Sequence, residues 1–292
     1  MSQVPLHLLR YQLPMIWGVM QAFVPPLRRF SHHTGHGSLK RQIAAPADTL
    51  VNHYVAWSGA DPQRYGDILP PHLFSQWGIP LVTDLLLQTG YALTGIINQG
   101  VTITIHDQLP RRQPLCVEVT LESVEEAEGR IRLSAHISTG TVEQPALQVA
   151  TLHMLLIQPS YKRRKGDIKA PAQHDWHSVG QWQAAADDGF GFALLTGDFN
   201  PIHWIRAAGK RSPFRQMVLH GFGMFARSYE QLPNVAALTE IDVRFLRPVP
   251  LPSCMLSVQC AEPIEQADGQ QHVPLRLIGQ GNKVHMMGHC QY

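Results

Sequence analysis

Leu195-Thr-Gly-Asp-Phe-Asn-Pro-Ile-His203, followed by Leu219-His220-Gly221, is the most informative part of the chain. Gly197 permits a tight turn, Asp198 can bond to nearby main chain, and Pro201 ends a strand or begins a helix. By itself the first segment would indicate a turn and a helix start around a structural histidine. Together with a His-Gly pair that begins an apolar run, it indicates an acid–base site beside a helix N-terminus.

Both segments match the motif of the MaoC-like dehydratases, the (R)-specific enoyl-CoA hydratases. That motif runs Ser/Thr-Gly-Asp-x-Asn-Pro-[Ile/Leu/Val]-His and, further on, Leu-His-Gly. The residues that match it are Thr196, Gly197, Asp198, Asn200, Pro201, Ile202, His203, Leu219, His220 and Gly221. The chain therefore resembles this family. The resemblance implies a hot-dog fold, in which a curved antiparallel sheet wraps a long helix, and the reversible hydration of trans-2-enoyl thioesters to (R)-3-hydroxyacyl thioesters.

The resemblance also implies roles for individual residues. Asp198 and His203 would hold a water molecule between them, Asn200 would orient them, and the Gly221 N–H would receive the thioester oxygen. Basic side chains near the site could meet the phosphates of coenzyme A or of a carrier-protein pantetheine, with solvated surface charge as the alternative. The residues expected to contact the substrate are Phe199, Arg206, Lys210, Arg211 and His220.

An internal repeat divides the chain at an offset of 138 residues (197 − 59). Tyr54-Val-Ala-Trp-Ser-Gly59 aligns with Phe192-Ala-Leu-Leu-Thr-Gly197, and the same offset aligns Cys116 with Cys254. Each half continues with one apolar helix and four alternating strands. We expect helices at 81–93 and 221–232, and strands at 101–106, 116–123, 130–138, 148–157, 240–246, 254–260, 272–278 and 283–290.

The repeat predicts an α+β double hot-dog, two tandem units that imitate a hot-dog dimer. Its expected parts are an N-terminal extension (1–37), packed on the surface, a non-catalytic unit (38–158), a linker (159–174) and a catalytic unit (175–292). The offset places Ala60, Pro62 and Tyr65 opposite Asp198, Asn200 and His203. The counterpart of the His-Gly pair would be Pro80-Leu81, and Asp61 would be a turn residue. The first unit should therefore lack this chemistry.

Composition excludes several classes of protein. A chain of 292 residues that is 44% hydrophobic with a net charge of +2 is globular. The basic run 162–165 has no aromatic residues between its charges, so we expect a solvated linker and no nucleic-acid partner. The apolar stretch 12–27 is too short and too broken by proline to span a membrane, which favours a cytoplasmic protein.

Cysteine and histidine spacing indicates neither disulfides nor a metal. The cysteines, Cys116, Cys254, Cys260 and Cys290, show no Cys-x-x-Cys pair and should be reduced core or strand residues. His32, His33 and His36 fall in an expected loop. His285 and His289 fall on an expected strand, where positions i and i+4 lie roughly 13 Å apart and cannot share an ion. We expect no metal and no cofactor beyond the coenzyme A or phosphopantetheine of the substrate.

Two alternatives stay open. A hot-dog thioesterase would use a carboxylate on the central helix, for which Asp84 is the candidate. An acyl-thioester-binding protein without turnover would keep the fold, and the chain departs from the family motif at Trp204-Ile205 and at 210–214. An acyl carrier protein is a possible partner, and either a monomer or a homodimer of double hot-dogs is compatible with the sequence.

Overall fold

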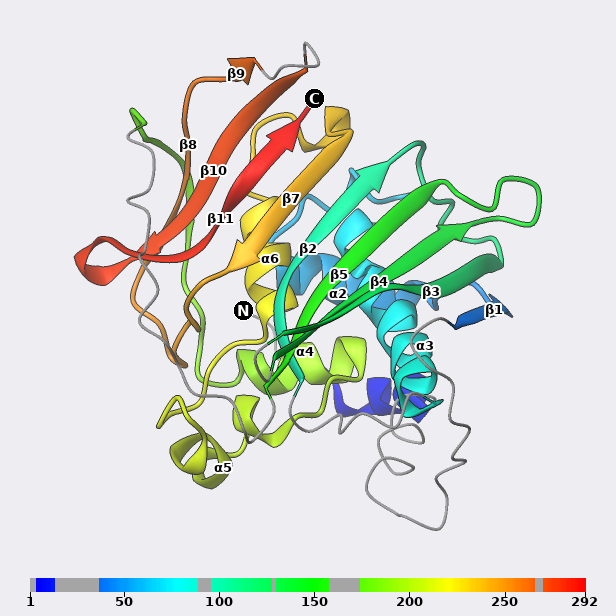
Figure 1. Ribbon diagram of the computed structural model, residues 1–292, viewed down its shortest axis with the longest axis horizontal. Helices are drawn as coiled ribbons and strands as arrows, with labels where there is room; N and C mark the ends of the chain where they lie inside the picture. Colours follow the sequence, from blue (N-terminus) through cyan, green and yellow to red (C-terminus); the bar gives the residue numbers. More distant parts are fainter. Residues whose placement is uncertain (1–3, 14–36, 89–95, 128–129, 158–173, 266–269) are drawn as a thin grey trace.

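The computed structural model describes residues 4–13, 37–88, 96–127, 130–157, 174–265 and 270–292 (Figure 1). Its strands are β1 (Ser38–Ile43), β2 (Ile96–Ile105), β3 (Leu115–Ala127), β4 (Arg130–Gly140), β5 (Gln148–Ile157), β6 (His177–Trp182), β7 (Glu240–Phe245), β8 (Leu256–Cys260), β9 (Ile264–Glu265), β10 (Gln271–Gly279) and β11 (Lys283–Gln291). Its α-helices are α2 (Asp48–Ser58), α3 (Ser75–Gln88), α4 (Asp188–Thr196), α5 (Arg206–Arg211) and α6 (Gly221–Tyr229). Short 3₁₀ segments are η1 (Leu6–Gln12), η3 (Pro71–Phe74), η5 (Pro201–His203), η6 (Val235–Ala237) and η7 (Gln280–Asn282).

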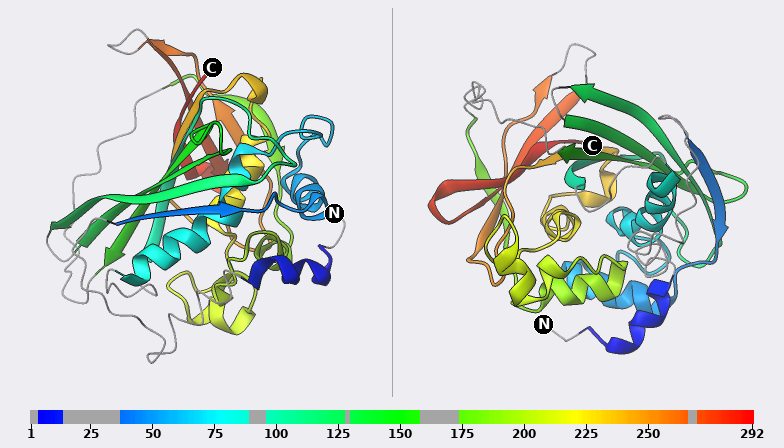
Figure 2. Two further views of the ribbon diagram at one scale, coloured as in Figure 1. Left: turned by 90° about the vertical axis from the view of Figure 1, so that its right-hand side faces the viewer. Right: turned by 60° about the horizontal axis from the view of Figure 1, so that its bottom comes forward.

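One antiparallel sheet joins the two halves of the chain. Its order is β1-β3-β4-β5-β2-β7-β11-β10-β8-β6, with β9 paired to β10 beside this path. Read inward from either end and leaving out β9, each half contributes its first, third, fourth, fifth and second strands, so the second strand of each half meets the other half. The halves join through β2 and β7, from Gly100 opposite Arg244 to Thr104 opposite Glu240. The predicted double hot-dog is confirmed: the sheet curves over the helices of both halves (Figure 2).

Local geometry confirms the repeat at the end of the first helix in each half. Gly59 ends α2 and Gly197 ends α4, and both adopt left-handed φ angles, 81° and 84°. The N–H of each glycine bonds to the carbonyl four residues before it in its helix. The predicted counterpart of the His-Gly pair is wrong, however. The Leu69 N–H bonds to the Leu109 carbonyl, and the Leu219 N–H makes the matching bond to the Val249 carbonyl, so Leu69 and Leu219 are equivalent. The residues that follow them are Pro70-Pro71 in the first half and His220-Gly221 in the second.

The strand predictions agree closely with the structure, and the helix predictions agree less well. The predicted helix at 81–93 begins earlier, at Ser75, so that Pro80 lies inside α3; residues 89–95 lie outside the described residues. Six of the described α-helices and strands were not expected: β1, β6, β9, α2, α4 and α5. The α4 sequence contains two glycines in nine residues and is buried along most of its length. Its propensity and periodicity are weak, and tertiary packing determines its conformation.

A buried carboxylate ties the two halves together. Glu230, just after α6, accepts hydrogen bonds from Arg64 (2.6 Å) and Tyr65 (2.7 Å) and lies 2.7 Å from His72 Nε2, and its side chain is fully buried. Burial by itself would raise the pKa of Glu230, but the hydrogen bonds from His72 and Tyr65 and the charge of Arg64 hold it below its usual value. Removing any one partner would leave a buried charge undercompensated.

Other sequence predictions have mixed outcomes. All four cysteines are free, but Cys254 is exposed and precedes β8, because β8 begins at Leu256. His285 and His289 lie on β11 as expected. Asp61 is a turn residue, as its carboxylate accepts the Gln63 N–H at 2.9 Å. His32, His33, His36 and the basic run 162–165 lie outside the described residues. Among the described helices, none combines the length and apolar character needed to cross a membrane.

Candidate active site

Helix α4 carries the first part of the site. It ends at Gly197, and the left-handed turn there directs the chain into Asp198 and then η5, which contains His203. Gly189, on the first turn of α4, makes this path possible: a Cβ atom at that position would lie 1.9 Å from the His203 carbonyl oxygen. Sequence reasoning missed Gly189, because only the tertiary structure shows that main chain passes against it.

Hydrogen bonding fixes the tautomer of His203. Its Nδ1 lies 2.7 Å from the Val218 carbonyl oxygen, which can only accept, so Nδ1 carries the hydrogen and Nε2 keeps a free lone pair. Burial lowers the pKa of His203, while the charge of Asp198 and the hydrogen bond to Val218 act in the opposite direction. The ring is therefore neutral at pH 7 and can accept a proton at Nε2.

His220 lies next to His203 and is almost fully buried. The two rings stack with centroids 3.6 Å apart and an interplanar angle of 28°. His220 Nε2 lies 2.9 Å from the Asp198 carbonyl oxygen and 3.9 Å from its carboxylate, so Nε2 carries the hydrogen. Its Nδ1 is buried without a hydrogen-bond partner among the described residues. The predicted contact with substrate stays a prediction; the contact that the structure does contain is to the main chain of Asp198.

We expect acid to destabilise the fold through His220. Burial, with a smaller contribution from His203, lowers its pKa from 6.5 to about 3. In the unfolded chain His220 binds a proton once the pH falls below about 6.5, whereas in the folded protein it does not, so the free energy of unfolding falls from that pH towards about 3. The slope for this one group is at most about 1.4 kcal/mol per pH unit.

Urea unfolding of the wild type and of His220→Asn at pH 7.5 and pH 5 measures this contribution. The variant should lose less stability between the two pH values than the wild type does. His106→Asn, a change at an exposed histidine, is the control. Equal losses in the wild type and the His220 variant would contradict the expectation.

Asn200 supports the turn, and its carboxamide bonds to neither predicted catalytic side chain; its main-chain N–H does bond to Asp198. Its Oδ1 accepts the Ile202 N–H at 3.3 Å, which caps η5, and its own N–H bonds to Asp198 Oδ1 at 3.3 Å. Any orienting effect on His203 therefore passes through the main chain of η5. Phe199 is half-buried, and its carbonyl oxygen accepts the Trp204 indole N–H at 3.2 Å.

Gly221 begins α6, and the first N–H groups of a helix have no intrahelical acceptor. Such a group, at the positive end of the helix, is suited to a developing oxyanion. Phe245, at the end of β7, lies against Gly221: a Cβ atom at 221 would be 2.7 Å from two of its ring carbons. Glycine is therefore required here for close approach, a requirement that the motif alone does not explain.

Gly221→Ala should lower the free energy of unfolding by about 1–3 kcal/mol, because the new methyl group forces the Phe245 ring to move. Denaturant unfolding measures the change. Gly66→Ala is the matched control, since the nearest atom to its Cβ position is 3.6 Å away and φ is not positive. A Gly221 variant as stable as the control would show that Phe245 yields without cost.

Asp198, His203 and His220 also form a group that could hold a metal, with one ligand atom of each within 4.8 Å of the others. The hydrogen bonds do not suit an ion. His220 Nε2 is used by the Asp198 carbonyl, and the in-plane lone pairs of two stacked rings do not converge on one point. Binding would need one ring to turn, and the lack of a metal stays a prediction.

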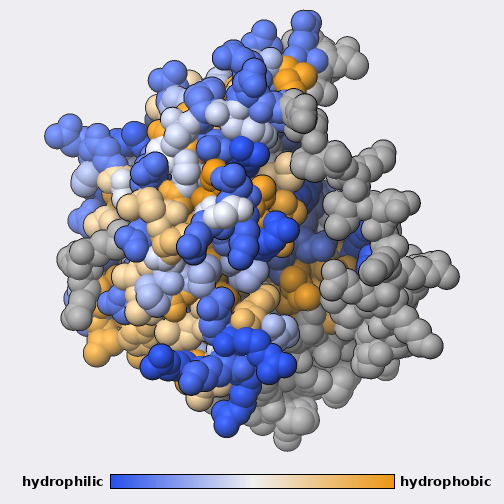
Figure 3. Space-filling model, turned by 90° about the vertical axis from the view of Figure 1, so that its left-hand side faces the viewer, coloured by the Kyte–Doolittle hydropathy of each residue, from blue (hydrophilic) through white to orange (hydrophobic). Residues whose placement is uncertain are grey.

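Four basic residues lie between the two histidines, on α5 and the loop that follows it. Arg206, Lys210, Arg211 and Arg215 are all exposed, and none pairs with a carboxylate within the described ranges. Strongly hydrophilic side chains gather at the bottom of the left-hand face, where Figure 1 places α5 (Figure 3). Between Asp198 and Glu230 the sequence contains no acidic residue, so this loop presents uncompensated positive charge beside the site.

Among the described residues of the first half there is no equivalent group of three. Ala60 follows Gly59 as Asp198 follows Gly197, and Tyr65, which the sequence offset pairs with His203, donates its hydroxyl to Glu230. Asp84, the carboxylate expected for a thioesterase, lies on α3, and burial raises its pKa. It is outside the Asp198–His203–His220 group.

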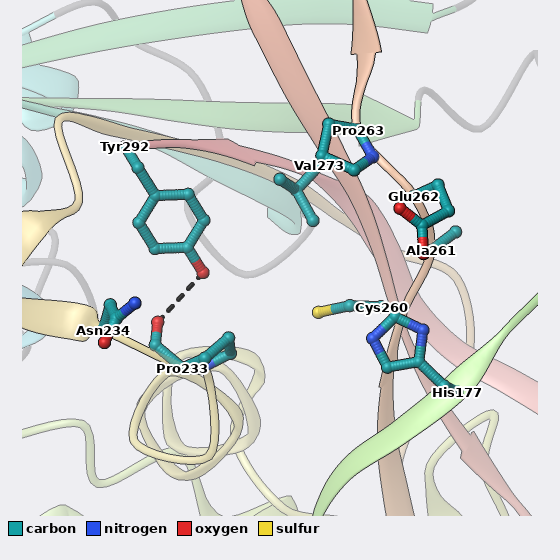
Figure 4. A pocket seen from close by; sticks show the side chains of 9 residues that line it. All are labelled: His177, Pro233, Asn234, Cys260, Ala261, Glu262, Pro263, Val273 and Tyr292. Atoms are coloured by element: carbon teal, nitrogen blue, oxygen red, sulfur yellow. Dashed lines mark hydrogen bonds between the residues drawn. The ribbon is translucent and has the colours of Figure 1, made fainter.

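A cavity of about 270 Å³ opens elsewhere in the second half, between the segment after α6 and the strands β6, β8 and β10. In Figure 4 the Tyr292 hydroxyl donates to the Pro233 carbonyl on one side, and Cys260 and His177 line the other. Burial raises the pKa of Cys260 to about 12, so its thiol is protonated at neutral pH. The lining includes none of the predicted site residues, and we do not assign this cavity to the chemistry.

Comparisons with known proteins agree with this geometry. Residues 168–272 match the family model described as MaoC like domain. Among solved structures, HtdX of Mycobacterium tuberculosis is 20% identical, with a TM-score of 0.69 over 87% of this chain and 99% of that one. A protein described as a MaoC-like dehydratase is 14% identical, with a TM-score of 0.70 over 88% and 98%. A search of curated proteins finds no match.

A further similar structure is a conserved hypothetical protein of Mycobacterium tuberculosis described as a double hot-dog. It is 11% identical, with a TM-score of 0.53 over 89% of this chain and 96% of that one. At these identities the structures support the fold alone. The molecule has a double hot-dog fold, and most of its second half matches the MaoC like domain model.

Proposed function

We propose that the protein is an (R)-specific hydratase that adds water to trans-2-enoyl thioesters. The observation that carries the proposal is the state of His203: a buried neutral imidazole whose Nε2 is free, grouped with the Asp198 carboxylate. Hydration needs a base to take a proton from water, an acid to give a proton to Cα, and a donor that stabilises the thioester oxygen. A base of this kind, next to a carboxylate and the first N–H of a helix, supplies these three functions.

In the proposed reaction, His203 Nε2 takes one proton from a water molecule as the water oxygen bonds to Cβ of the substrate. The electron pair of the Cα=Cβ bond moves to the thioester oxygen, which the Gly221 N–H stabilises. The imidazolium then gives its proton to Cα, so one water is added and His203 is neutral again. Asp198 accepts a hydrogen bond from the other O–H of the water, which stays in the product as its 3-hydroxyl group, and stabilises the imidazolium through its charge.

Purified protein with crotonyl-CoA tests the proposal. A hydratase removes the enoyl absorbance, a thioesterase releases free thiol, and a binding protein does neither. We expect loss of the absorbance without thiol release and an (R)-3-hydroxybutyryl product on chiral analysis. A predominantly (S) product, or thiol release alone, would contradict the proposal.

Exposed cations of α5 should contribute to binding of the thioester carrier. We expect the triple variant Arg206→Ala, Lys210→Ala, Arg211→Ala to raise KM for an enoyl-CoA about tenfold at low salt with kcat within about twofold, since these side chains would meet phosphates away from the reacting carbons. Higher salt should raise the wild-type KM and reduce the difference between the two proteins.

The control for this prediction is Lys40→Ala with Arg41→Ala, which removes exposed cations from β1. An unchanged KM in the α5 variant would mean that its charges are only solvated surface. The acyl carrier protein, the oligomeric state and the location in the cytoplasm stay predictions from the sequence.

A further inference from the structure

Helix α4 ends with a main-chain acceptor that the helix itself does not use. In a continuous helix the Leu194 carbonyl would accept the N–H of residue 198, but the left-handed turn at Gly197 takes Asp198 out of the helix. The last bond of the helix is the one from the Gly197 N–H to the Ala193 carbonyl. The Leu194 carbonyl, only four residues before Asp198, therefore needs a hydrogen-bond donor from elsewhere in the molecule.

Gln12 supplies that partner from the N-terminal part of the sequence. Its side-chain Nε2 donates to the Leu194 carbonyl oxygen at 2.9 Å, and the residue is 1% exposed. The two residues are 182 positions apart in the sequence. Because a buried carboxamide requires hydrogen-bond partners, this bond is a specific tertiary contact. It holds the last turn of α4 from outside the helix.

The rest of η1 packs on the same helix. Leu8 is fully buried, and a Cβ atom at Gly191 of α4 would lie 3.2 Å from Val4. Gly191 thus lets residues 4–12 approach α4 closely. The views of Figure 2 show η1 lying along the outer side of α4 and α2. The opposite side of η1 is exposed at Leu6, Leu9 and Arg10.

We propose that residues 4–12 are a positioning element of the site, in which the Gln12 carboxamide fixes the end of α4 and so the place of Asp198. The proposal rests on the proposed hydratase function for its kinetic consequence. It predicts an effect on the chemical step, because a small misplacement of a catalytic group costs rate while leaving substrate contacts intact.

Gln12→Leu removes the donor at similar volume. We expect kcat for enoyl-CoA hydration to fall about tenfold or more with KM within about twofold. Gln12→Glu should behave similarly at neutral pH, because a carboxylate cannot donate to a carbonyl. As the pH falls and the carboxyl becomes protonated, its kcat relative to the wild type should recover, whereas a loss of packing would not depend on pH. Gln144→Leu, the same exchange at an exposed position outside this segment, is the control and should have no effect.

Hydrogen–deuterium exchange tests the positioning independently of any activity. In Gln12→Leu, peptides that cover 195–203 should exchange about tenfold faster, while β10 and β11 stay as protected as in the wild type. If the wild type has no hydratase activity, the proposed function fails, but this measurement still decides the positioning. Unchanged exchange at 195–203 would overturn the inference. Faster exchange throughout the second half would also overturn it, because it would mean that Gln12 stabilises the whole second half and does not specifically position residues 195–203. If Gln12→Leu does not fold, Gln12→Met is measured in the same way.

Discussion

Asp198→Asn and His203→Gln should each lower kcat/KM for enoyl-CoA hydration by at least about 10²-fold, and by up to about 10⁴-fold, the usual contribution of general acid–base catalysis. The first change removes the charge that stabilises an imidazolium, and the second removes the free lone pair at Nε2. Because both residues would act on the same water molecule, the double variant should lose much less than the product of the two single losses. Steady-state rates with crotonyl-CoA measure the effect.

Matched controls distinguish chemistry from folding. Asp175→Asn and His106→Gln make the same exchanges at exposed positions and should leave the rate within about twofold. Thermal unfolding of the two site variants should remain cooperative, since Asp198 is partly exposed and glutamine fills much of the His203 space. A site variant with the wild-type rate and a normal unfolding curve would refute the assignment of that residue.

Arg227→Met should have the largest effect on stability, a loss of about 3–5 kcal/mol in the free energy of unfolding. Arg227, on α6, forms a bidentate pair with Asp188 at the start of α4, with distances of 2.6 and 2.7 Å, and is 1% exposed. Its guanidinium also lies 4.2 Å from the centre of the Trp57 ring, on α2 of the first half. The variant leaves the Asp188 carboxylate buried without its cation.

Lys40→Met is the control for this prediction. It breaks an ion pair between Lys40 and Glu118 whose side chains are 57% and 44% exposed, so the expected loss is at most about 1 kcal/mol. Urea unfolding at pH 7 measures both variants. Adding Asp188→Leu to Arg227→Met should recover part of the lost stability, because it removes the unpaired charge. A loss below about 1 kcal/mol for Arg227→Met would mean that water reaches Asp188.

The sequence by itself determined the architecture and predicted which residues of the candidate site lie together. The motif from Thr196 to Gly221 predicted which side chains would come together, and Asp198, His203 and His220 do lie in one group. The alternation of apolar and polar residues in the strands of each half predicted the double hot-dog. This period of two residues directs one face of each strand to the helix, and it is visible in the local sequence.

Only the tertiary structure decided how those groups are arranged and bonded. The free Nε2 of His203, its stacking on His220 and the bond from Gln12 to Leu194 each join residues distant in sequence, and no local pattern encodes them. The same reason explains why α4 was missed: its glycines are poor helix formers, but the His203 main chain passes against Gly189, and Val4 and Trp57 pack against Gly191. Local preference is worth a few tenths of a kcal/mol per residue, and close packing outweighs it.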